Sequence, residues 1–480
     1  MEECNRKRTR LTQKLGTWSP SQLPKGKVAI DTKWVFRLKE DGIKKARLVA
    51  RGFQLKEDES SKFSYAPVCR MTTLRILISQ AVRNDWTMRQ VDVPTAFLNS
   101  TLNEEIYIKK PKGLNCSEEI LKLNRALYGL KISPRCWNDK FSEIMEMNGF
   151  NRSQHDYCLY YANDVYLLLF VDDALITGKT EQVENLIKIL YNNFKVKDMG
   201  EANSFLGMQF NRTDDSLIII QNKIINKLLK EFNMENCRNV ATPMEVGFKI
   251  EETEMVIDVP YRQLVCSLMY IAVITRPDLS FAVSMLSRVL DRPTNQTWQA
   301  AKRVLRYLNA TKEMGLKFEK SEGKLISYSD ADWAGDQISK KSVSGFVAFD
   351  GSNPIAWFSK KQNCVALSTM EAEYCAASAA EEELINLKGV LCEFDMSYNK
   401  KFIIKVDNCS AISLVKNFEN SKRGKHIDIK MHFIKDLYAK EIVDVEYIQS
   451  ECNAADILTK SLCKDKFVKH RKTILNESCN

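Results

Sequence analysis

The sequence predicts a multidomain protein of mixed α+β and α/β class. Its 480 residues exceed what one ordinary hydrophobic core organises, so two or three domains are expected. Segments with strand patterning lie on both sides of a helical stretch that runs from about residue 250 to 320. A hydrophobic content of 44% and a charged content of 28% are typical of a soluble globular chain.

Composition also argues against several classes of protein. The longest apolar runs, such as Val165–Val171, are far too short to span a membrane, so no membrane partner is expected. No leader with a charged, an apolar and a small-residue region opens the chain, which disfavours secretion. The fourteen cysteines contain no C-x-x-C pair, which indicates reduced thiols in the cytosol rather than disulfides or a zinc site.

The excess positive charge of +10 lies at the N-terminal end. Residues 1–56 hold fifteen Lys or Arg and five Asp or Glu, and the rest of the chain holds fifty-six of each sign. A basic segment favours a polyanionic partner, because neutralising phosphates releases their counterions. A solvated surface explains the same charge, so charge alone does not decide the partner.

The first part of the chain predicts a basic arm followed by strands and helices. Residues 1–27 are charged and interrupted by prolines, as in a linker. From Ile30 to Phe53 short apolar stretches alternate with basic residues around an Asp-Gly turn at 41–42, which favours a hairpin. Helices are expected around Thr73–Asn84 and Pro134–Asn148.

A buried strand pair is expected around two adjacent acids, Asp172 and Asp173. The run Tyr166–Val171 is apolar and apolar character resumes over Ala174–Thr177, so two strands would meet at a turn that carries both carboxylates. Thr180 then caps a helix whose apolar residues share one face, namely Val183, Leu186, Ile187 and Leu190.

The second half changes from helices back to strands. Two apolar stripes separated by Pro293 and Thr294 predict a helix pair; they are Val283, Leu286 and Leu290, then Trp298, Ala301, Val304, Leu305 and Leu308. After Gly323 the pattern predicts strands, a long helix and a further strand, over Lys324–Ser329, Val343–Phe349, Pro354–Ser359, Thr369–Leu391 and Phe402–Val406 in that order.

The first candidate site is acidic. Asp172 and Asp173 follow an apolar strand, where adjacent carboxylates are costly unless a cation lies between them. Mg²⁺ prefers such hard oxygen ligands, and Mn²⁺ is the alternative ion. Asp92 also ends a short apolar stretch, and three acids on neighbouring strands would hold two metal ions about 4 Å apart. A solvated turn is the simpler interpretation of any isolated Asp-Asp pair.

The residues around these acids resemble the reverse transcriptase of copia-type (Ty1/copia, Pseudoviridae) retrotransposons. The matching blocks span about residues 28–245 and occur in the family's order, as Lys45–Phe53, Val91–Asn99, Leu127–Lys131, Phe170–Asp173 and Phe205–Gly207. The resemblance implies a fingers–palm–thumb RNA-directed DNA polymerase whose palm binds two Mg²⁺ ions through Asp92, Asp172 and Asp173. The chain departs from the family's usual residues at Pro94, Ile132 and Phe170, and none of these changes removes a metal ligand.

The resemblance also implies nucleotide-binding residues. Phe97 matches the steric gate that excludes a ribose 2′-hydroxyl, with core packing as its alternative role. Tyr128 and Gly129 would border the nucleotide pocket, and Met199–Glu201 falls where a primer-gripping hairpin is expected. Three basic residues of the fingers would bind the incoming triphosphate or the template, namely Lys45, Arg47 and Arg51.

A second acidic set occupies the C-terminal third. Asp330 and Asp407 each end a predicted strand, Glu373 lies on the long helix and Asp456 starts a final helix, so distant segments would converge on one metal pair. Because acidic residues are common, their spacing alone is weak evidence for a metal site. The residues around them resemble the ribonuclease H domain of the same retrotransposon class over about residues 324–462, which implies cleavage of RNA in RNA–DNA hybrids with two Mg²⁺ ions.

Some assignments stay open. Asp332 and Glu371 are the alternatives to Asp330 and Glu373. His426 and His432, six residues apart on an expected helix, would point about 240° apart, so one shared metal ion is not expected. Basic residues of the connecting helices would face hybrid phosphates or simply solvent, namely Lys302, Arg303 and Arg306.

The predicted division is an arm (1–27), a reverse transcriptase (28–249), a thumb or connection (250–323), a ribonuclease H-like mixed-sheet domain (324–462) and a basic tail (463–480). The implied partners are RNA template, DNA primer, RNA–DNA hybrid and dNTPs, with the gag and integrase parts of a polyprotein of which this chain would be a fragment. The implied location is the cytoplasm, in virus-like particles, and the nucleus at integration. An inactive remnant that binds nucleic acid is the first alternative and another palm-fold enzyme, such as a cyclase, is the second.

Overall fold

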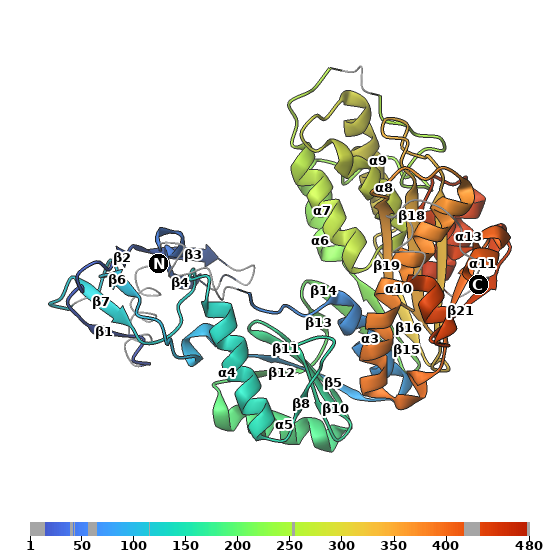
Figure 1. Cartoon of the computed structure of the whole chain (residues 1–480). Coiled ribbons are helices and arrows are strands. Elements are labelled where there is room, and N and C mark those ends of the chain that lie inside the picture. Colours follow the sequence, from blue (N-terminus) through green and yellow to red (C-terminus); the bar gives the residue numbers. More distant parts are fainter. Residues whose placement is uncertain are drawn as a thin grey trace. The chain divides into compact units, whose positions relative to one another are not determined.

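The computed structural model describes residues 15–38, 42, 44–55, 65–114, 116–251, 255–416 and 433–477. The chain forms two compact units that do not follow its linear order. The N-terminal unit comprises Met1–Arg70 and Thr87–Glu201, and the C-terminal unit comprises Met71–Trp86 and Ala202–Asn480. Helix α3 (Met71–Arg83) therefore belongs to the C-terminal unit, although the residues on both sides of it belong to the other (Figure 1).

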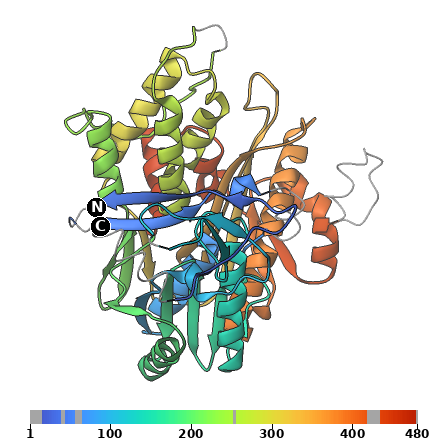
Figure 2. The same ribbon diagram turned by 90° about the vertical axis from the view of Figure 1, so that its left-hand side faces the viewer.

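One subdomain of the N-terminal unit holds a four-stranded sheet and a hairpin. The sheet order is β1 (Trp18–Pro20), β7 (Ile120–Leu123), β6 (Tyr107–Lys109) and β2 (Ala29–Ile30). The predicted hairpin is confirmed by antiparallel strands β3 (Thr32–Leu38) and β4 (Lys44–Ala50), the paired long arrows of Figure 2. Strand β1 was predicted as part of an arm, because a three-residue strand that pairs with residues about a hundred positions away has no periodicity of its own.

The other subdomain is a six-stranded antiparallel sheet packed against two helices. Its strand order is β12 (Lys197–Glu201), β5 (Thr87–Asp92), β11 (Asp173–Gly178), β10 (Val165–Phe170), β9 (Leu159–Ala162) and β8 (Asn151–Arg152). Helices α4 (Ser133–Met147) and α5 (Thr180–Asn193) contact it, and both are predicted helices (Figure 1). The four predicted apolar residues of α5 are buried, but the cap position is Lys179 and no side chain caps the helix.

The C-terminal unit begins with a small sheet and a helical layer. The sheet order is β13 (Ser204–Phe205), β14 (Met208–Arg212), β15 (Ser216–Ile220) and β16 (Leu316–Glu319). The helices are α6 (Asn222–Glu231), α7 (Tyr261–Ile274), α8 (Ser280–Leu286) and α9 (Asn295–Ala310). The predicted helix pair is confirmed as α8 and α9, and Thr294 begins α9 with a capping box to Thr297.

A five-stranded mixed sheet forms the rest of this unit. Its order is β19 (Asn353–Lys361), β18 (Val343–Asp350), β17 (Leu325–Asp332), β20 (Phe402–Val406) and β21 (Val443–Tyr447). β20 runs parallel to β17 and to β21, and the other neighbours are antiparallel. Helix α10 (Thr369–Phe394) packs on β17, β18 and β20 (Figure 1). The predicted long helix and four of the strands are confirmed.

The predicted basic tail is partly a packed helix, α13 (Lys464–Leu475). Its Phe467, His470 and Ile474 are buried, and the Phe467 ring meets the Tyr307 ring at 5.6 Å between centroids. Five lysines and arginines in twelve residues give the segment a polar appearance, because the long basic side chains cover an apolar stripe. In the part of the chain that the structure describes, no helix is long and apolar enough to cross a membrane.

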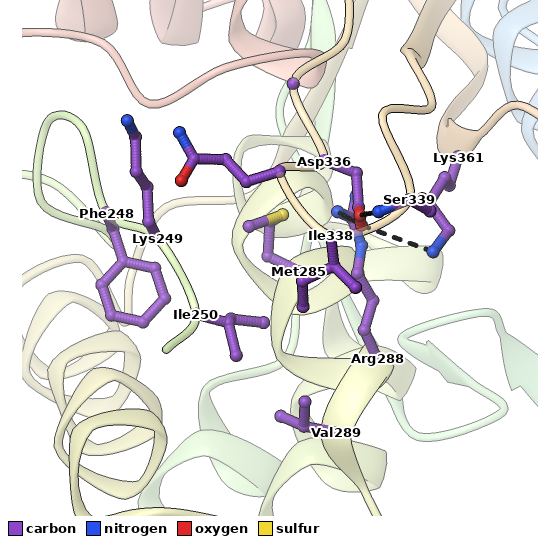
Figure 3. Close-up of a pocket in the computed structure, with 12 residues that line it drawn as sticks. Phe248, Lys249, Ile250, Met285, Arg288, Val289, Asp336, Ile338, Ser339 and Lys361 are labelled. Carbon is purple, nitrogen blue, oxygen red and sulfur yellow. Dashed lines mark hydrogen bonds and ion pairs between the residues drawn. The ribbon is translucent and has the colours of Figure 1, made fainter. Parts of the chain in front are cut away.

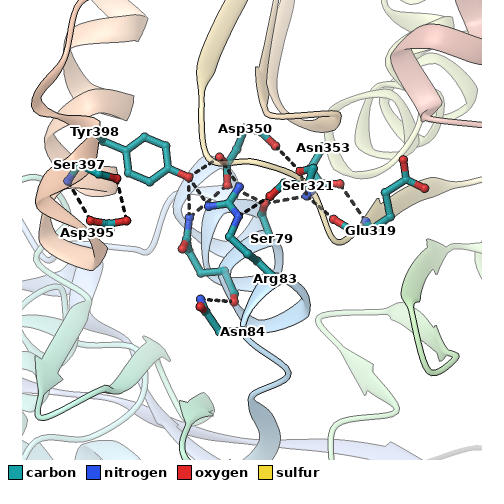
Figure 4. Close-up of polar contacts among 11 residues, drawn as sticks. Ser79, Arg83, Asn84, Glu319, Ser321, Asp350, Asn353, Asp395, Ser397 and Tyr398 are labelled. Carbon is teal, nitrogen blue, oxygen red and sulfur yellow. Dashed lines mark hydrogen bonds and ion pairs between the residues drawn. The ribbon is translucent and has the colours of Figure 1, made fainter.

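A buried polar network anchors α3 in the C-terminal unit (Figure 4). The fully buried carboxylate of Asp350 accepts hydrogen bonds from Arg83 at 2.6 Å and from Ser79 Oγ at 2.7 Å. Tyr398 and Gln80 donate to the same carboxylate, and Asn353 donates to Ser79. Since a buried ionised carboxylate is costly unless its oxygens are paired, this network favours the observed position of α3.

Candidate active sites

Three carboxylates gather at one end of the six-stranded sheet. Asp92 ends β5 and lies directly opposite Asp173, the first residue of β11, in the antiparallel register. Side chains of directly opposed residues share a face of the sheet, with Cβ atoms about 5 Å apart. Asp172 precedes Asp173 in the two-residue turn between β10 and β11, where Phe170 pairs with Asp173. The structure therefore brings the three predicted acids of this unit together.

The turn that carries Asp172 is held in an unusual backbone conformation. Val171 has a φ of 56°, in the left-handed region that a β-branched residue rarely adopts and that costs about 1–3 kcal/mol. Two hydrogen bonds hold it, from Trp137 Nε1 to the Val171 carbonyl at 2.6 Å and from the Val93 N–H to the Asp172 carbonyl at 2.7 Å. Sequence reasoning missed Trp137, because nothing local links it to a turn more than thirty residues away.

The electrostatics of this cluster suit a cation. Burial raises the pKa of Asp173, and the neighbouring charges of Asp172 and Asp92 raise it further. A hydrogen bond with Gln90 and the charge of Lys45 act in the opposite direction. A divalent ion that prefers oxygen ligands would relieve the repulsion among the three carboxylates, so these residues fit Mg²⁺.

Most of the predicted nucleotide-binding residues lie together. The Phe97 and Tyr128 rings stack at a tilt with centroids 4.7 Å apart, and the Arg47 guanidinium lies 5.5 Å from the Tyr128 centroid. Gly129 has a φ of +91°, and a Cβ there would fall 2.1 Å from the Ala50 carbonyl oxygen, so only glycine fits against β4. Lys45 lies near enough to Asp173 for its positive charge to lower the pKa of that carboxyl.

Arg51 takes a different position. It follows β4, its side chain is exposed, and its backbone N–H donates to the Asp31 carbonyl at 2.8 Å. Its guanidinium is among the charges that lower the pKa of Asp31, after the Gln54 and Lys109 contacts. Among the described residues no contact joins the Arg51 side chain to Phe97 or Tyr128. Met199 and Gly200 lie on β12, beside β5, and Met199 is 49% exposed.

The C-terminal unit holds a tighter acidic cluster. Asp330 on β17, Glu373 on α10 and Asp407 after β20 each offer a carboxylate oxygen, and these oxygens lie within 4.8 Å of one another. β17 runs on to Asp332, so Asp330 lies inside the strand rather than at its end. The parallel pairing of β17 with β20 brings the two aspartates to the same end of the sheet.

Asp456, the fourth predicted acid, is not a member of this group of three, but it lies close enough for its charge to raise the pKa of Asp330. It is buried in the 3₁₀ turn η7 (Ala454–Leu458) rather than at the start of an α-helix. Its carboxylate pairs with Lys460 Nζ at 2.7 Å, and the same ammonium lies 3.9 Å from Asp330 Oδ2. Lys460 is a functional candidate that sequence reasoning passed over, and its signal was the four-residue spacing from Asp456.

Burial makes this second cluster strongly perturbed. Burial raises the pKa of Glu373, and the charges of Asp330 and Asp407 raise it further. Burial also raises the pKa of Asp330, against the lowering effect of Lys460. Glu373 Oε1 accepts the Ala331 N–H at 3.1 Å, whereas its buried Oε2 has no hydrogen-bond partner among the described residues. An unpaired buried carboxylate oxygen in a group of three acids fits a bound divalent metal.

The geometry favours the two acids chosen over their alternatives. The Glu371 carboxylate accepts the Leu367 N–H at 2.8 Å and its own N–H bonds Ser368 Oγ, so it serves the start of α10. Asp332 lies two residues along β17 from Asp330, outside the group of three. His426 and His432 lie outside the described residues, and the segment gives no test of them.

The basic residues of α9 are engaged within the protein. Arg303 pairs with Glu245 at 2.8 Å, and Lys302 Nζ lies 5.5 Å from the Trp298 ring centroid. Arg306 is partly exposed. These contacts account for Lys302 and Arg303 without a nucleic-acid partner.

Comparison with known proteins adds independent findings. Residues 15–246 match the family described as "Reverse transcriptase (RNA-dependent DNA polymerase)". The chain is 40% identical to the retrovirus-related Pol polyprotein from transposon TNT 1-94 of Nicotiana tabacum, over 95% of this chain and 36% of that protein. It is 36% identical to the Pol polyprotein from transposon RE1 of Arabidopsis thaliana, over 94% of this chain and 32% of that one. The chain thus spans about a third of the length of these relatives.

A shorter relative and two solved structures extend the likeness. The transposon Ty5-1 protein of Saccharomyces cerevisiae is 31% identical over 61% of this chain and is covered over 100% of its own length. A foamy viral protease-reverse transcriptase in complex with double-stranded DNA matches 92% of this chain and 68% of its own, with a TM-score of 0.55 and 13% identity. Its complex with an RNA/DNA hybrid matches 94% of this chain and 61% of its own, with a TM-score of 0.51 and 12% identity. At these identities the structures show likeness of fold.

Proposed function

The chain belongs to the reverse transcriptase family of copia-type (Ty1/copia) retrotransposon Pol polyproteins, and from that premise we propose two activities for it. The N-terminal unit copies RNA into DNA at Asp92, Asp172 and Asp173. The C-terminal unit cleaves RNA in RNA–DNA hybrids at Asp330, Glu373 and Asp407, with Asp456 nearby. The observation that carries the proposal is the presence of two separate carboxylate clusters, each assembled from residues far apart in sequence.

At the polymerase site the protein's task is to hold metal, primer and nucleotide in line. Asp92 and Asp173 share a face of the sheet, and the strained turn at Val171 fixes the direction of Asp172. Bound Mg²⁺ ions would lower the pKa of the primer 3′-hydroxyl and neutralise the charge on the leaving pyrophosphate. Lys45 and Arg47 add positive charge on the β4 side, where a triphosphate needs counter-charge.

The stacked rings support selection of the deoxyribose. Phe97 is 8% exposed and rests on Tyr128, so the ring cannot swing aside without losing core contacts in the N-terminal unit. A rigid ring at the pocket wall excludes a 2′-hydroxyl by shape. Gly129 lets the loop that carries Tyr128 approach β4, and the Ala50 N–H donates to the Tyr128 carbonyl at 2.8 Å.

At the nuclease site the protein's task is to hold several carboxylates close together in a largely buried position. The three carboxylates of Asp330, Glu373 and Asp407 would hold Mg²⁺, with Mn²⁺ as the alternative, and such an ion would supply activation of water and stabilisation of the leaving oxygen. Lys460 balances the negative charge of Asp330 and Asp456. Thr459 Oγ1 donates to Asp330 and holds that carboxylate towards its neighbours.

The partners follow from this chemistry and from the relatives. RNA template, DNA primer and dNTPs serve the polymerase, and an RNA–DNA hybrid serves the nuclease; the solved neighbours were captured with double-stranded DNA and with a hybrid. The curated relatives are Pol polyproteins, which supports the gag and integrase parts of such a polyprotein as companions. Location in the cytoplasm within virus-like particles, and in the nucleus at integration, is part of the same proposal.

The polymerase is tested by dTTP incorporation on poly(rA)/oligo(dT). Wild type should incorporate dTTP, and Asp172→Asn should not. Asp164→Asn is the matched control, since Asp164 is an exposed acid of the same unit that pairs with Lys179. Equal incorporation by wild type and Asp172→Asn would show that the polymerase site is assigned wrongly. No incorporation by wild type would favour the alternative that the chain is an inactive remnant.

The nuclease is tested by cleavage of a labelled RNA–DNA hybrid. Asp407→Asn should abolish cleavage and spare incorporation. Asp444→Asn on the neighbouring strand β21 is the matched control, because Asp444 is 39% exposed and pairs with Lys416. Cleavage retained by Asp407→Asn shows that the acidic cluster is misassigned.

A further inference from the structure

Lys460 lies beside the acidic cluster of the C-terminal unit and contacts two of its carboxylates. Its Nζ is 2.7 Å from Asp456 Oδ1 and 3.9 Å from Asp330 Oδ2. The preceding residue, Thr459, is fully buried and donates its hydroxyl to the same Oδ2 of Asp330, so the backbone that carries Lys460 is held against β17. The Lys460 side chain is 42% exposed, whereas those of Asp330 and Asp456 are 3% and 7% exposed. The lysine therefore lies between two buried acids and the solvent.

Two other cations of the same unit are paired with a different acid (Figure 3). Asp336, in the loop after β17, accepts a hydrogen bond from Arg288 Nη1 at 2.8 Å and lies 3.4 Å from Lys361 Nζ. Burial raises the pKa of Asp332, and the charge of Lys460 opposes this rise more strongly than the charge of Arg288 does. Among the described residues, Lys460 is therefore the cation that acts on the cluster most directly.

Two divalent ions at this cluster would have different ligands. Asp330, Glu373 and Asp407 each offer an oxygen within 4.8 Å of the others, which suits one ion held by three carboxylates. A second ion would lie about 4 Å from the first and needs acids of its own. Asp456 is the predicted acid that remains, and Asp330 can serve both ions because a carboxylate has two oxygens. The ammonium of Lys460 lies at these two acids.

An ammonium and a divalent cation cannot occupy the same position between two carboxylates. Positive charges a few ångströms apart repel strongly where the surroundings are largely buried. Lysine carries its charge on a flexible four-carbon stem, so the side chain can move into solvent while its backbone stays in place. This movement breaks the ion pair with Asp456 and leaves a buried carboxylate unbalanced until another cation binds. The first ion meets no such obstacle, whereas the second must displace Lys460.

We propose that the Lys460 ammonium takes the place of a second metal ion in the resting C-terminal unit. One divalent ion binds at Asp330, Glu373 and Asp407, and a second binds at Asp330 and Asp456 only when the ammonium moves out. Lys460 thereby sets the metal concentration at which the second position fills. The inference rests on the proposed nuclease and concerns how many ions its site holds before it acts.

The test counts bound Mn²⁺ through the EPR signal of the free ion, in the full chain with Asp172→Asn and Asp173→Asn to remove the polymerase site. This parent chain should bind one ion tightly and a second with a Kd at least about tenfold higher. Lys460→Met keeps the length of the side chain and removes its charge, so the second Kd should fall about tenfold. The spectrum of two coupled ions about 4 Å apart should then appear at lower Mn²⁺ concentration. Lys460→Arg should keep the parent pattern, and so should the control Lys464→Met, which removes an exposed lysine four residues away.

Equal Kd values for the two ions in the parent chain overturn the inference, and so does a second Kd that Lys460→Met leaves unchanged or that Lys464→Met lowers equally. The first of these outcomes needs no variant of Lys460, so it decides the matter even if Lys460→Met fails to fold by thermal denaturation. The proposed nuclease is scored separately, because Asp407→Asn should weaken the first ion by about tenfold or more. A first ion that Asp407→Asn leaves unchanged refutes the metal site of the proposed function. A weakened first ion beside an unchanged second Kd in Lys460→Met refutes the role of Lys460 alone.

Discussion

The two acidic clusters solve the same electrostatic problem in different ways. Asp92 and Asp173 are direct neighbours in one antiparallel ladder, half open to solvent, and a strained turn completes their site. Asp330, Glu373 and Asp407 come from two strands and a helix and are largely buried. In the first cluster the backbone conformation of a turn positions one of the carboxylates, whereas in the second the carboxylates lie largely buried, where a cation or a proton is needed to neutralise their charge.

The largest expected effect tests whether the two sites act independently. Asp172→Asn should lower DNA synthesis by about a hundredfold or more and leave hybrid cleavage unchanged, and Asp407→Asn should do the reverse, since each change removes a proposed metal ligand worth several kcal/mol. Paired incorporation and cleavage assays on the same preparations measure this. If either variant loses both activities, the two clusters are not separate sites.

The second prediction separates the effect of burial on the pKa of a carboxylate from the effect of neighbouring charges, and it uses another glutamate of α10. Glu381 lies eight residues after Glu373 and is fully buried, with no hydrogen-bond partner for either oxygen among the described residues. Burial raises its pKa to about 9. From its usual 4.5 to about 9 the folded state binds more protons than the unfolded state, so stability falls as pH rises through that window.

Glu381→Gln should remove this pH dependence. At pH 8 we expect the variant to be more stable than wild type by about 5 kcal/mol, and at pH 4 nearly equal, because about 3.5 pH units separate 4.5 from 8 and each corresponds to about 1.4 kcal/mol. Urea unfolding at the two pH values measures the difference. Glu383→Gln, an exposed acid of the same helix, is the control and should show no such trend. A Gln variant less stable at pH 8 would mean that the buried carboxylate has a partner.

Metal binding should stabilise the buried cluster. At a concentration ten times its Kd, Mg²⁺ or Mn²⁺ should raise the free energy of unfolding of the C-terminal unit by about 1.4 kcal/mol, because only the folded state holds the three carboxylates together. Thermal melts with metal and with EDTA measure this. Asp407→Asn should lose the gain and Asp444→Asn should keep it; a gain that survives Asp407→Asn places the metal elsewhere.

The smallest effect concerns the turn of the polymerase site. Trp137→Phe removes the hydrogen bond to the Val171 carbonyl, worth about 1 kcal/mol, so the rate of synthesis should fall about fivefold with KM for dTTP unchanged. Phe141→Leu is the control, since Phe141 packs on Trp137 in the same core without touching the turn. It should lower stability and leave the rate per folded molecule unchanged. Equal rates for both variants show that Trp137 only fills the core.

The same comparison explains what sequence predicted well. Asp172 and Asp173 are adjacent, so a run of apolar residues before them was enough to predict a strand and a carboxylate turn. Asp330 and Asp407 become neighbours only through the parallel pairing of β17 with β20, and Glu373 reaches them from helix α10, so the resemblance of the surrounding motifs had to supply that link. Trp137 acts through a contact with a turn distant in sequence, so no local pattern marked it as a candidate, whereas Lys460 carried only the four-residue spacing from Asp456. Their positions depend on packing.

The secondary structure was also predicted best where a sequence pattern is long and local. Long periodic segments such as α9 and α10 were predicted closely, whereas β1 and α13 were missed. β1 is too short to show alternation, and α13 hides an apolar stripe beneath lysines. Helix α3 was predicted in the right place along the chain, but its membership in the C-terminal unit depends on the Asp350 network, whose members lie hundreds of residues apart.

The anchoring of α3 has a consequence for synthesis of the protein on the ribosome. Arg83 is made 267 residues before its partner Asp350, which at 5–20 residues per second is a delay of roughly 10–50 s. During that time the apolar residues of α3, among them Leu74, Ile76 and Leu77, have no completed surface to bury against. A nascent chain that has already completed its N-terminal unit therefore keeps this helix unburied until Asp350 has been made. We therefore expect a chaperone to bind this helix during translation.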